Sequence, residues 1–149
     1  MINKLRVRAQ SESGFTLVEL LVVMLILGLL AAIAIPSFFN QRDKAKDADA
    51  KESVRTAQTA IETYATDHNG TYVGATAADL QAIENTLNDA DLQDPTGLAQ
   101  DTYKVTVISD NDSPNHTFSN QRQADGKTLL SCEAPTDDLD GCPDSGLWG

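Results

Sequence analysis

The hydrophobic positions of this chain are concentrated in one long run near its start. Between Leu17 and Ile35 the only charged residue is Glu19, and every other position is apolar or glycine. A helix over Phe15 to Ile35 would be about 31 Å long, which is enough to cross the hydrocarbon core of a bilayer. The basic residues before the run predict a cytoplasmic N-terminal end, and they are Lys4, Arg6 and Arg8.

Three interpretations of this run compete. It can be a secretory signal peptide cleaved near Ala32-Ile33-Ala34, a single-span anchor, or a segment that is in the membrane for only part of its life. A carboxylate costs about 2.5–3.5 kcal/mol at the centre of an inserting helix, and less near its end. From the residues alone, Glu19 is either a tolerated charge in a plain anchor or a functional group.

The residues around Glu19 carry a family resemblance. The stretch Ser13-Gly14-Phe15-Thr16-Leu17-Val18-Glu19-Leu20-Leu21 follows a short basic leader, and a glycine and a proline come later at Gly28 and Pro36. Over about residues 8–40 the chain resembles the type IV pilins and the pseudopilins of type II secretion and competence systems. This resemblance implies a leader over 1–14, a membrane and filament-core helix over 15–36, and a globular head over 37–149 that includes the second half of the helix.

In that family a prepilin peptidase of the inner membrane cuts after the glycine and N-methylates the new N-terminus. The resemblance therefore implies cleavage between Gly14 and Phe15 and methylation of Phe15. The new amine of one subunit and Glu19 of the next would relieve each other's desolvation cost. Gly28 and Pro36 weaken the helix between them, and either a kink or loss of helicity on packing is expected there, as in several pilin filaments.

The remaining sequence predicts an α+β head. Apolar residues at helical spacing continue the helix from Ser37 to about His68, and they are Ala50, Val54, Ala57, Ile61 and Tyr64. Asn69-Gly70 would end this helix, with Gly70 in the left-handed position. A capping box predicts a short helix from Thr76 to about Asn88, with Leu80, Ile83 and Leu87 on its inner face. Three strands are predicted over 103–108, 116–122 and 127–132, in a small antiparallel sheet that the long helix covers.

The long helix also carries a band of mixed charge, made of Arg42, Asp43, Lys44, Lys46, Asp47, Asp49, Lys51, Glu52 and Arg55. Two interpretations stay open. The band is either a solvated face with pairs such as Asp47–Lys51, or a surface for ion pairs between subunits.

Cys132 and Cys142 are the only cysteines. A disulfide between them would contribute roughly 3 kcal/mol in the chain-entropy model, and pilins commonly close a C-terminal loop in this way. A metal site is the alternative, but His68 and His116 lack a ligand spacing to these cysteines. Asp137, Asp138 and Asp140 inside the loop are a weak calcium candidate, since pseudopilins of type II secretion often bind calcium there. No other cofactor is expected.

Charge and the absence of catalytic motifs argue against two further classes of function, nucleic-acid binding and enzymatic activity. The chain has 149 residues and a net charge of −11, and the part after Arg55 carries −13. Such a head is not expected to bind nucleic acid or anionic lipid. The sequence has no nucleophile–base pair, metal triad or phosphate-binding glycine loop, so an enzyme is not expected.

The resemblance then predicts a structural subunit of a type IV pilus that serves adhesion, motility or DNA uptake. Its expected partners are identical subunits in a helical filament, the prepilin peptidase, the inner-membrane assembly machinery and the membrane. It would lie in the inner membrane and then in a surface pilus. The alternatives are a periplasmic pseudopilin of a secretion or competence system and a membrane-anchored binding module.

Overall fold

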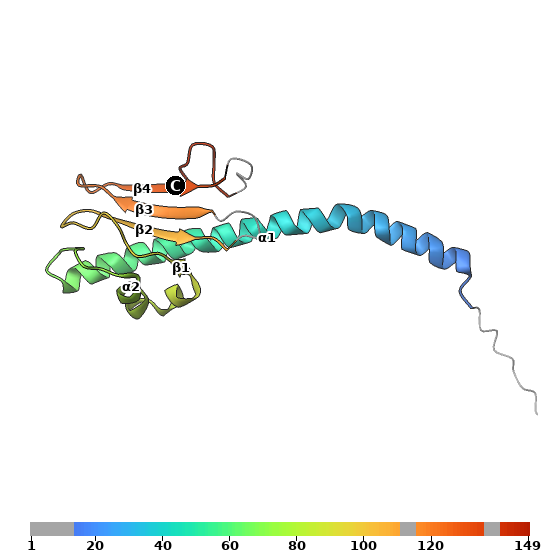
Figure 1. Cartoon of the computed structure of the whole chain (residues 1–149), viewed down its shortest axis with the longest axis horizontal. Helices are drawn as coiled ribbons and strands as arrows, with labels where there is room; N and C mark the ends of the chain where they lie inside the picture. The colour runs from blue at the N-terminus through green and yellow to red at the C-terminus, as the bar shows by residue number, and fades with distance from the viewer. Residues whose placement is uncertain (1–13, 111–115, 136–140) are drawn as a thin grey trace, which may run out of the picture. The chain divides into compact units, whose positions relative to one another are not determined.

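The structure is a computed structural model, and it describes residues 14–110, 116–135 and 141–149. The chain divides into two compact units, one ending at Ser37 and the other running from Phe38 to Gly149. Helix α1, from Leu17 to Asp67, contributes to both units, and the second unit is the head (Figure 1). The description below takes each unit by itself.

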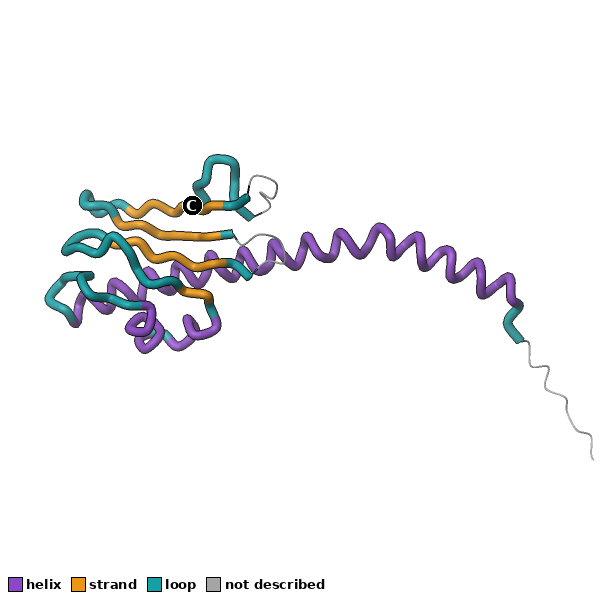
Figure 2. The backbone as a smooth tube through the Cα atoms, viewed as in Figure 1, coloured by secondary structure: helices purple, strands orange, loops and turns teal. Residues whose placement is uncertain are grey.

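The head is an α+β structure, as the sequence predicts. After α1 the elements are α2 (Ala77–Ile83), the 3₁₀ helix η1 (Asn85–Asp89) and the strands β1 (Asp91–Leu92), β2 (Tyr103–Ile108), β3 (Thr117–Arg122) and β4 (Thr128–Glu133). The strands form one antiparallel sheet in the order β1-β2-β3-β4. Figure 2 shows the sheet beside the second half of α1. The three expected strands are confirmed to within one residue at each end, and β1 is an addition.

The core lies between one face of α1 and the sheet. All five helical positions predicted to need a partner are buried, and Val54, Ala57 and Ile61 are completely so. On β2 the residues facing the helix are Tyr103, Val105 and Val107, which alternate with half-buried residues because successive strand side chains point to opposite faces. Neither layer could keep its apolar surface in water alone, so helix and sheet stabilise each other.

Helix α1 ends in a left-handed turn that begins one residue earlier than expected. Asn69 has a φ of 58° and Gly70 a φ of 78°. The Gly70 N–H donates to the carbonyl of Ala65 at 2.8 Å, across one more residue than a helical bond spans. This bond satisfies a carbonyl at the helix end, and Asn69 takes the left-handed position because asparagine tolerates it almost as glycine does.

The predicted capping box starts α2. The Thr76 Oγ1 accepts from the backbone N–H of Asp79, and the Asp79 carboxylate accepts from the backbone N–H of Thr76 at 3.0 Å. The helix is shorter than predicted, because the backbone becomes extended at Glu84 before η1 begins. This break changes the helical register: Leu80 and Leu87 are buried as expected, whereas Ile83 is 39% exposed and does not share their inner face.

The last residues of the chain cover part of the outer edge of β4. The Cys132 N–H donates to the Gly146 carbonyl at 2.8 Å, and the Trp148 N–H donates to the Leu130 carbonyl at 3.2 Å. The indole of Trp148 also donates to the Ser131 carbonyl and meets the ring of Phe118 edge-to-face. The C-terminal segment thus satisfies backbone groups that an open sheet edge would leave unpaired.

The core predicts a strong position dependence of stability. Replacing the fully buried Ile61 with alanine should lower the free energy of unfolding by about 2–5 kcal/mol, because it removes packed methylenes and leaves a cavity. The same change at Ile83, which is 39% exposed, is the matched control and should cost under about 1 kcal/mol. Denaturant unfolding of the full chain in detergent, followed by Trp148 fluorescence, measures both values. Equal losses would contradict this assignment of the core.

Candidate assembly site

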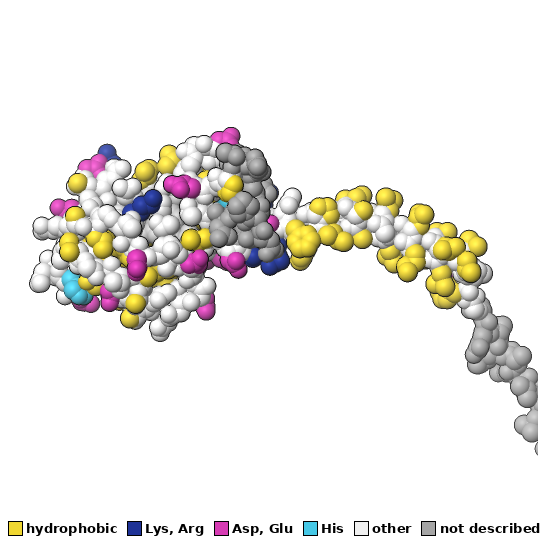
Figure 3. Space-filling model, in the orientation of Figure 1, with side chains coloured by type: hydrophobic (Ala, Val, Ile, Leu, Met, Phe, Trp, Pro, Cys, Tyr) yellow, Lys and Arg dark blue, Asp and Glu magenta, His cyan; other side chains and the backbone are white. Residues whose placement is uncertain are grey.

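The apolar half of α1 presents its side chains to the outside rather than to a core. Every large hydrophobic residue of this half is exposed, from Leu17 at 73% to Ile35 at 54%. Figure 3 shows these side chains covering the visible face of the helix. By length and composition, α1 can cross a membrane, because its most apolar window has a mean hydropathy of 2.9. An apolar surface of this extent needs lipid or other protein around it.

Glu19 forms a capping box at the start of this helix. Thr16 precedes the first helical residue, and its Oγ1 accepts from the Glu19 N–H at 3.2 Å. The Glu19 Oε2 accepts in return from the Thr16 N–H at 3.4 Å and from the Thr16 hydroxyl at 3.3 Å. Within one chain the carboxylate therefore rests against the positive end of the helix dipole. The spacing of Thr16 and Glu19 is the sequence pattern of a capping box, but our sequence analysis did not predict a helix start from it.

The residues predicted for leader cleavage lie just before α1, and those predicted to weaken the helix lie inside it. Gly14 and Phe15 precede it in non-helical backbone, and the Phe15 side chain is 76% exposed. Gly28 and Pro36 both lie inside α1, which continues through them. The single chain thus keeps its helix at these positions. Loss of helicity on packing concerns the assembled state, so it stays a prediction.

A buried polar junction joins α1 to two other parts of the head. Asp47 and His116 are each 1% exposed, and the Asp47 Oδ2 lies 2.8 Å from Nδ1 of His116, just before β3. Gly141 packs so closely that a Cβ there would overlap the Asp47 carboxylate. Lys51, one turn along α1, donates to the Gly141 carbonyl at 2.6 Å and lies over the Phe118 ring. Of the two interpretations left open for the charge band, the solvated face does not apply at Asp47, which is buried in the head.

A second polar cluster lies toward the other end of the head's helix. The Glu62 carboxylate accepts from the hydroxyl of Tyr72 at 2.6 Å, from the hydroxyl of Tyr103 at 3.0 Å and from Arg122 at 3.2 Å. Burial, then the hydrogen bond and the negative charge of Glu62, raise the pKa of Tyr72 to about 12. Burial and Glu62 also raise the pKa of Tyr103. The cluster ties α1 to β2, β3 and the loop after α1.

The cysteines pair as predicted, in a disulfide between Cys132 and Cys142. The calcium candidates Asp137, Asp138 and Asp140 lie outside the described residues. Within the described parts of the chain, no three His, Cys, Asp or Glu side chains are placed to hold a metal ion.

Known proteins with similar sequences share the N-terminal motif of this chain, and one of them is similar over much of the head as well. The family model described as the prokaryotic N-terminal methylation motif matches residues 10–35. The type IV major fimbrial protein FimA of Dichelobacter nodosus is 33% identical over 104 residues, which cover 68% of this chain and 67% of that protein. No solved structure is significantly similar.

Two further relatives match a shorter stretch. The type II secretion system core protein G of Pseudomonas aeruginosa is 39% identical over 59 residues, which are 40% of this chain and 42% of that protein. The competence protein ComGC of Halalkalibacterium halodurans is 34% identical over 58 residues, which are 39% of this chain and 57% of that protein. This chain therefore spans about four tenths of the secretion protein it matches, against two thirds of the fimbrial protein.

An exposed apolar helix that carries a methylation motif and continues into a small α+β head defines a class of prokaryotic proteins with an apolar N-terminal helix. Within that class, this chain belongs to the type IV pilin and pseudopilin family.

The Glu62 cluster predicts loss of stability at high pH. The folded chain keeps the protons of Tyr72 and Tyr103 where an unfolded tyrosine, with a pKa of about 10, gives its proton up. This contribution is complete below about pH 10 and is lost as the pH rises above it, with the part due to Tyr72 gone once the pH exceeds about 12. Urea unfolding at several pH values, with phenolate absorbance, measures it.

The Glu62→Gln variant is the control, because it removes the negative charge and keeps an acceptor. It should lower the pKa of Tyr72 and flatten the decline in stability above pH 10. An unchanged tyrosine titration in this variant would contradict the role given to Glu62.

Proposed function

We propose that this chain is the structural subunit of a type IV pilus filament. The observation that carries the proposal is the extent of the match to the major fimbrial protein. An alignment of 104 residues cannot be contained in the leader and α1, which end at Asp67, so the likeness reaches into the head. The role is structural rather than catalytic, and adhesion, motility and DNA uptake are the tasks that such a filament serves.

Processing begins at the inner membrane. A prepilin peptidase removes residues 1–14 by cutting between Gly14 and Phe15, and it methylates the amine of Phe15. The methylation motif over residues 10–35 supports this step, as does the non-helical backbone at both residues. The apolar helix then stays on the mature protein, which an ordinary secretory signal peptide would lose.

Assembly brings identical subunits together through the helix over residues 15–36, with the heads over residues 37–149 outward. The amine of Phe15 in one subunit meets Glu19 of its neighbour, because two opposite charges in an apolar bundle relieve each other's desolvation. Glu19 exchanges the capping contacts of the single chain for this stronger partner. The inner-membrane assembly machinery moves subunits from the membrane into a surface pilus, and the helix between Gly28 and Pro36 loosens on packing.

The second candidate is a pseudopilin of a secretion or competence system. The higher identity to the secretion core protein favours it, although that match is confined to 59 residues. Immunogold electron microscopy of material sheared from cells separates the two. Long labelled fibres support the pilus, whereas short filaments retained in the periplasm support the pseudopilin. A membrane-anchored binding module, the third alternative, needs no cleavage.

The processing step predicts a defined N-terminus. N-terminal sequencing and mass spectrometry of the chain from cells with a prepilin peptidase should find methylated Phe15 as the first residue. Gly14→Leu should block cleavage and leave the leader attached, because a bulky side chain cannot enter the narrow site that a glycine fits. Gly28→Leu is the matched control and should be processed normally. A mature chain that begins at Ile35 would favour a secretory signal instead.

The assembly step predicts that the charge of Glu19 is required. Glu19→Ala should be expressed and processed but yield at least tenfold less sheared filament, while Glu52→Ala, in the head part of α1, should assemble normally. Glu19→Gln separates charge from capping, since glutamine also completes a capping box. It should fail like the alanine variant. A normal yield from Glu19→Gln would remove the ion pair from the mechanism.

A further inference from the structure

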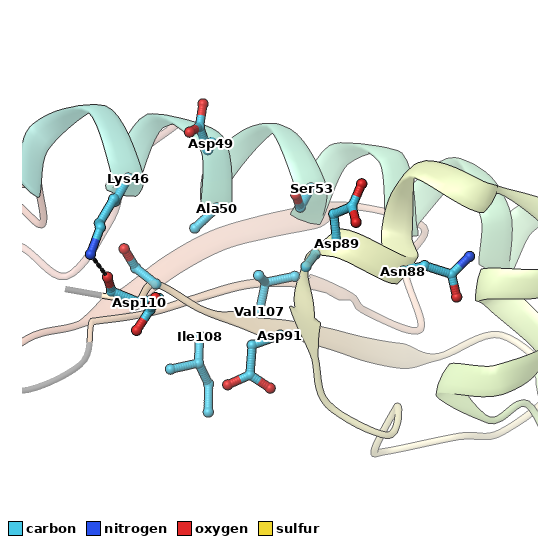
Figure 4. A pocket seen from close by; sticks show the side chains of 12 residues that line it. Lys46, Asp49, Ala50, Ser53, Asn88, Asp89, Asp91, Val107, Ile108 and Asp110 are labelled. Atoms are coloured by element: carbon cyan, nitrogen blue, oxygen red, sulfur yellow. Dashed lines mark hydrogen bonds between the residues drawn. The ribbon is translucent and has the colours of Figure 1, made fainter. Parts of the chain in front are cut away.

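A groove of about 470 Å³ opens on the head beside α1. Its walls come from α1, from the end of η1, from β1 and from the end of β2, and Figure 4 shows the side chains that line it. The lining combines apolar surface with carboxylates. The apolar residues are Ala50, Ala90, Val107 and Ile108, and the carboxylates are Asp49, Asp89, Asp91 and Asp110.

The charge of the groove is unbalanced. Its four carboxylates are all exposed, and Lys46 is the only cation among the residues that line it. The Lys46 ammonium donates to the backbone carbonyl of Asp110, so it lies at one end of the groove (Figure 4). Carboxylates gathered beside low-dielectric apolar walls favour a cationic group in the space between them.

A long cationic side chain fits this lining better than a metal ion does. No three acidic side chains of the described head come close enough to share an ion, because the carboxylates are spread along the groove. Lysine and arginine carry a flexible apolar stem that can lie on the half-buried Ala90 and Ile108 while the charged end reaches a carboxylate. The same chain supplies such residues, since Arg42 and Lys44 are exposed on α1 just before the groove begins.

We propose that the groove of one subunit binds the Arg42–Lys44 segment of α1 from the next subunit. This inference rests on the proposed filament. There the Phe15 amine of one copy lies level with Glu19 of its neighbour, which offsets parallel helices by four residues, or about 6 Å. Because all copies share one conformation, a head helix that runs along the filament keeps the same displacement, which puts Arg42 of one copy level with residue 46 of the other and Lys44 with residue 48. These levels coincide with the α1 wall of the groove, which runs from Lys46 to Ser53.

The contact gives Arg42 and Lys44 of the charge band a role between subunits, whereas Asp47 of the same band lies in the buried junction. Exposed ion pairs are individually weak, so these pairs set the orientation of one head against the next more than they hold the filament together. The groove thus complements the Glu19 contact, which fixes the offset along the axis.

Charge reversal tests the contact in intact filaments. Asp91→Lys should lower the yield of sheared filament at least tenfold, as should Lys44→Asp, and the two changes together should restore at least half of the wild-type yield. Asp125→Lys, in the turn between β3 and β4, is the control and should assemble normally. Trp148 fluorescence and the Cys132–Cys142 disulfide, read on non-reducing gels, verify that each head is folded.

Cross-linking provides the second readout. Two chains with different epitope tags, one with Lys44→Cys and the other with Asp91→Cys, are expressed together and treated with a short bismaleimide. We expect a dimer that carries both tags in sheared filaments, and none when Lys127→Cys replaces Asp91→Cys. Normal filaments without this dimer, or reversals that do not rescue each other, would overturn the groove contact alone. The absence of any filament from the wild-type chain would instead overturn the proposed function.

Discussion

A single carboxylate, Glu19, in the otherwise apolar first half of α1 is the constraint on which the rest of this molecule depends. Glu19 cannot be left without partners in lipid or in a packed bundle, because an ionised group loses several kcal/mol of hydration there. In one chain the Thr16 backbone and hydroxyl supply those partners through a capping box. These neutral donors compensate only part of the lost hydration. The proposed ammonium of a neighbouring copy is a stronger partner because it carries a full charge. Glu19 is therefore tolerated in the membrane, and its interaction free energy becomes more favourable in the filament.

In the head, the sheet packs on the second half of α1, whereas the large apolar side chains of the first half are exposed. Apolar packing around Val54 and Ile61 supplies most of the driving force, since it removes that face from water. Polar contacts at both ends then fix how the sheet is placed. Asp47 with His116 joins α1 to the start of β3, and Glu62 joins it to two tyrosines and an arginine. Because these groups are buried or half-buried, any sliding of the helix would leave them unpaired.

Periodic signals in the sequence predict much of this fold. Apolar spacing predicts the buried face of α1, alternation predicts β2 to its exact ends, and Thr76 with Asp79 predicts the start of α2. Features without a local period are not predicted from the sequence. The strand β1 has two residues, which are too few to show alternation. Ile83 is not on the inner face because the backbone becomes extended at Glu84 and ends the helical register. The burial of Asp47 depends on His116, 69 residues away, and on Gly141 in the disulfide loop, so the charged residues around it give no sign of it. At the candidate assembly site the family pattern predicts Gly14, Phe15 and Glu19, whereas the role proposed for them in a filament involves a second chain.

The position of the first helical residue has a consequence for proteolysis. Peptidases act on extended substrate backbone, and a scissile bond inside a helix must first be unwound at the expense of its hydrogen bonds. The Thr16 cap begins the helix at Leu17, so the peptide bond between Gly14 and Phe15 lies outside it. The same two side chains that stabilise the helix start therefore keep the proposed cleavage site in exposed, non-helical backbone, and the proposed cleavage would leave both of them on the mature protein.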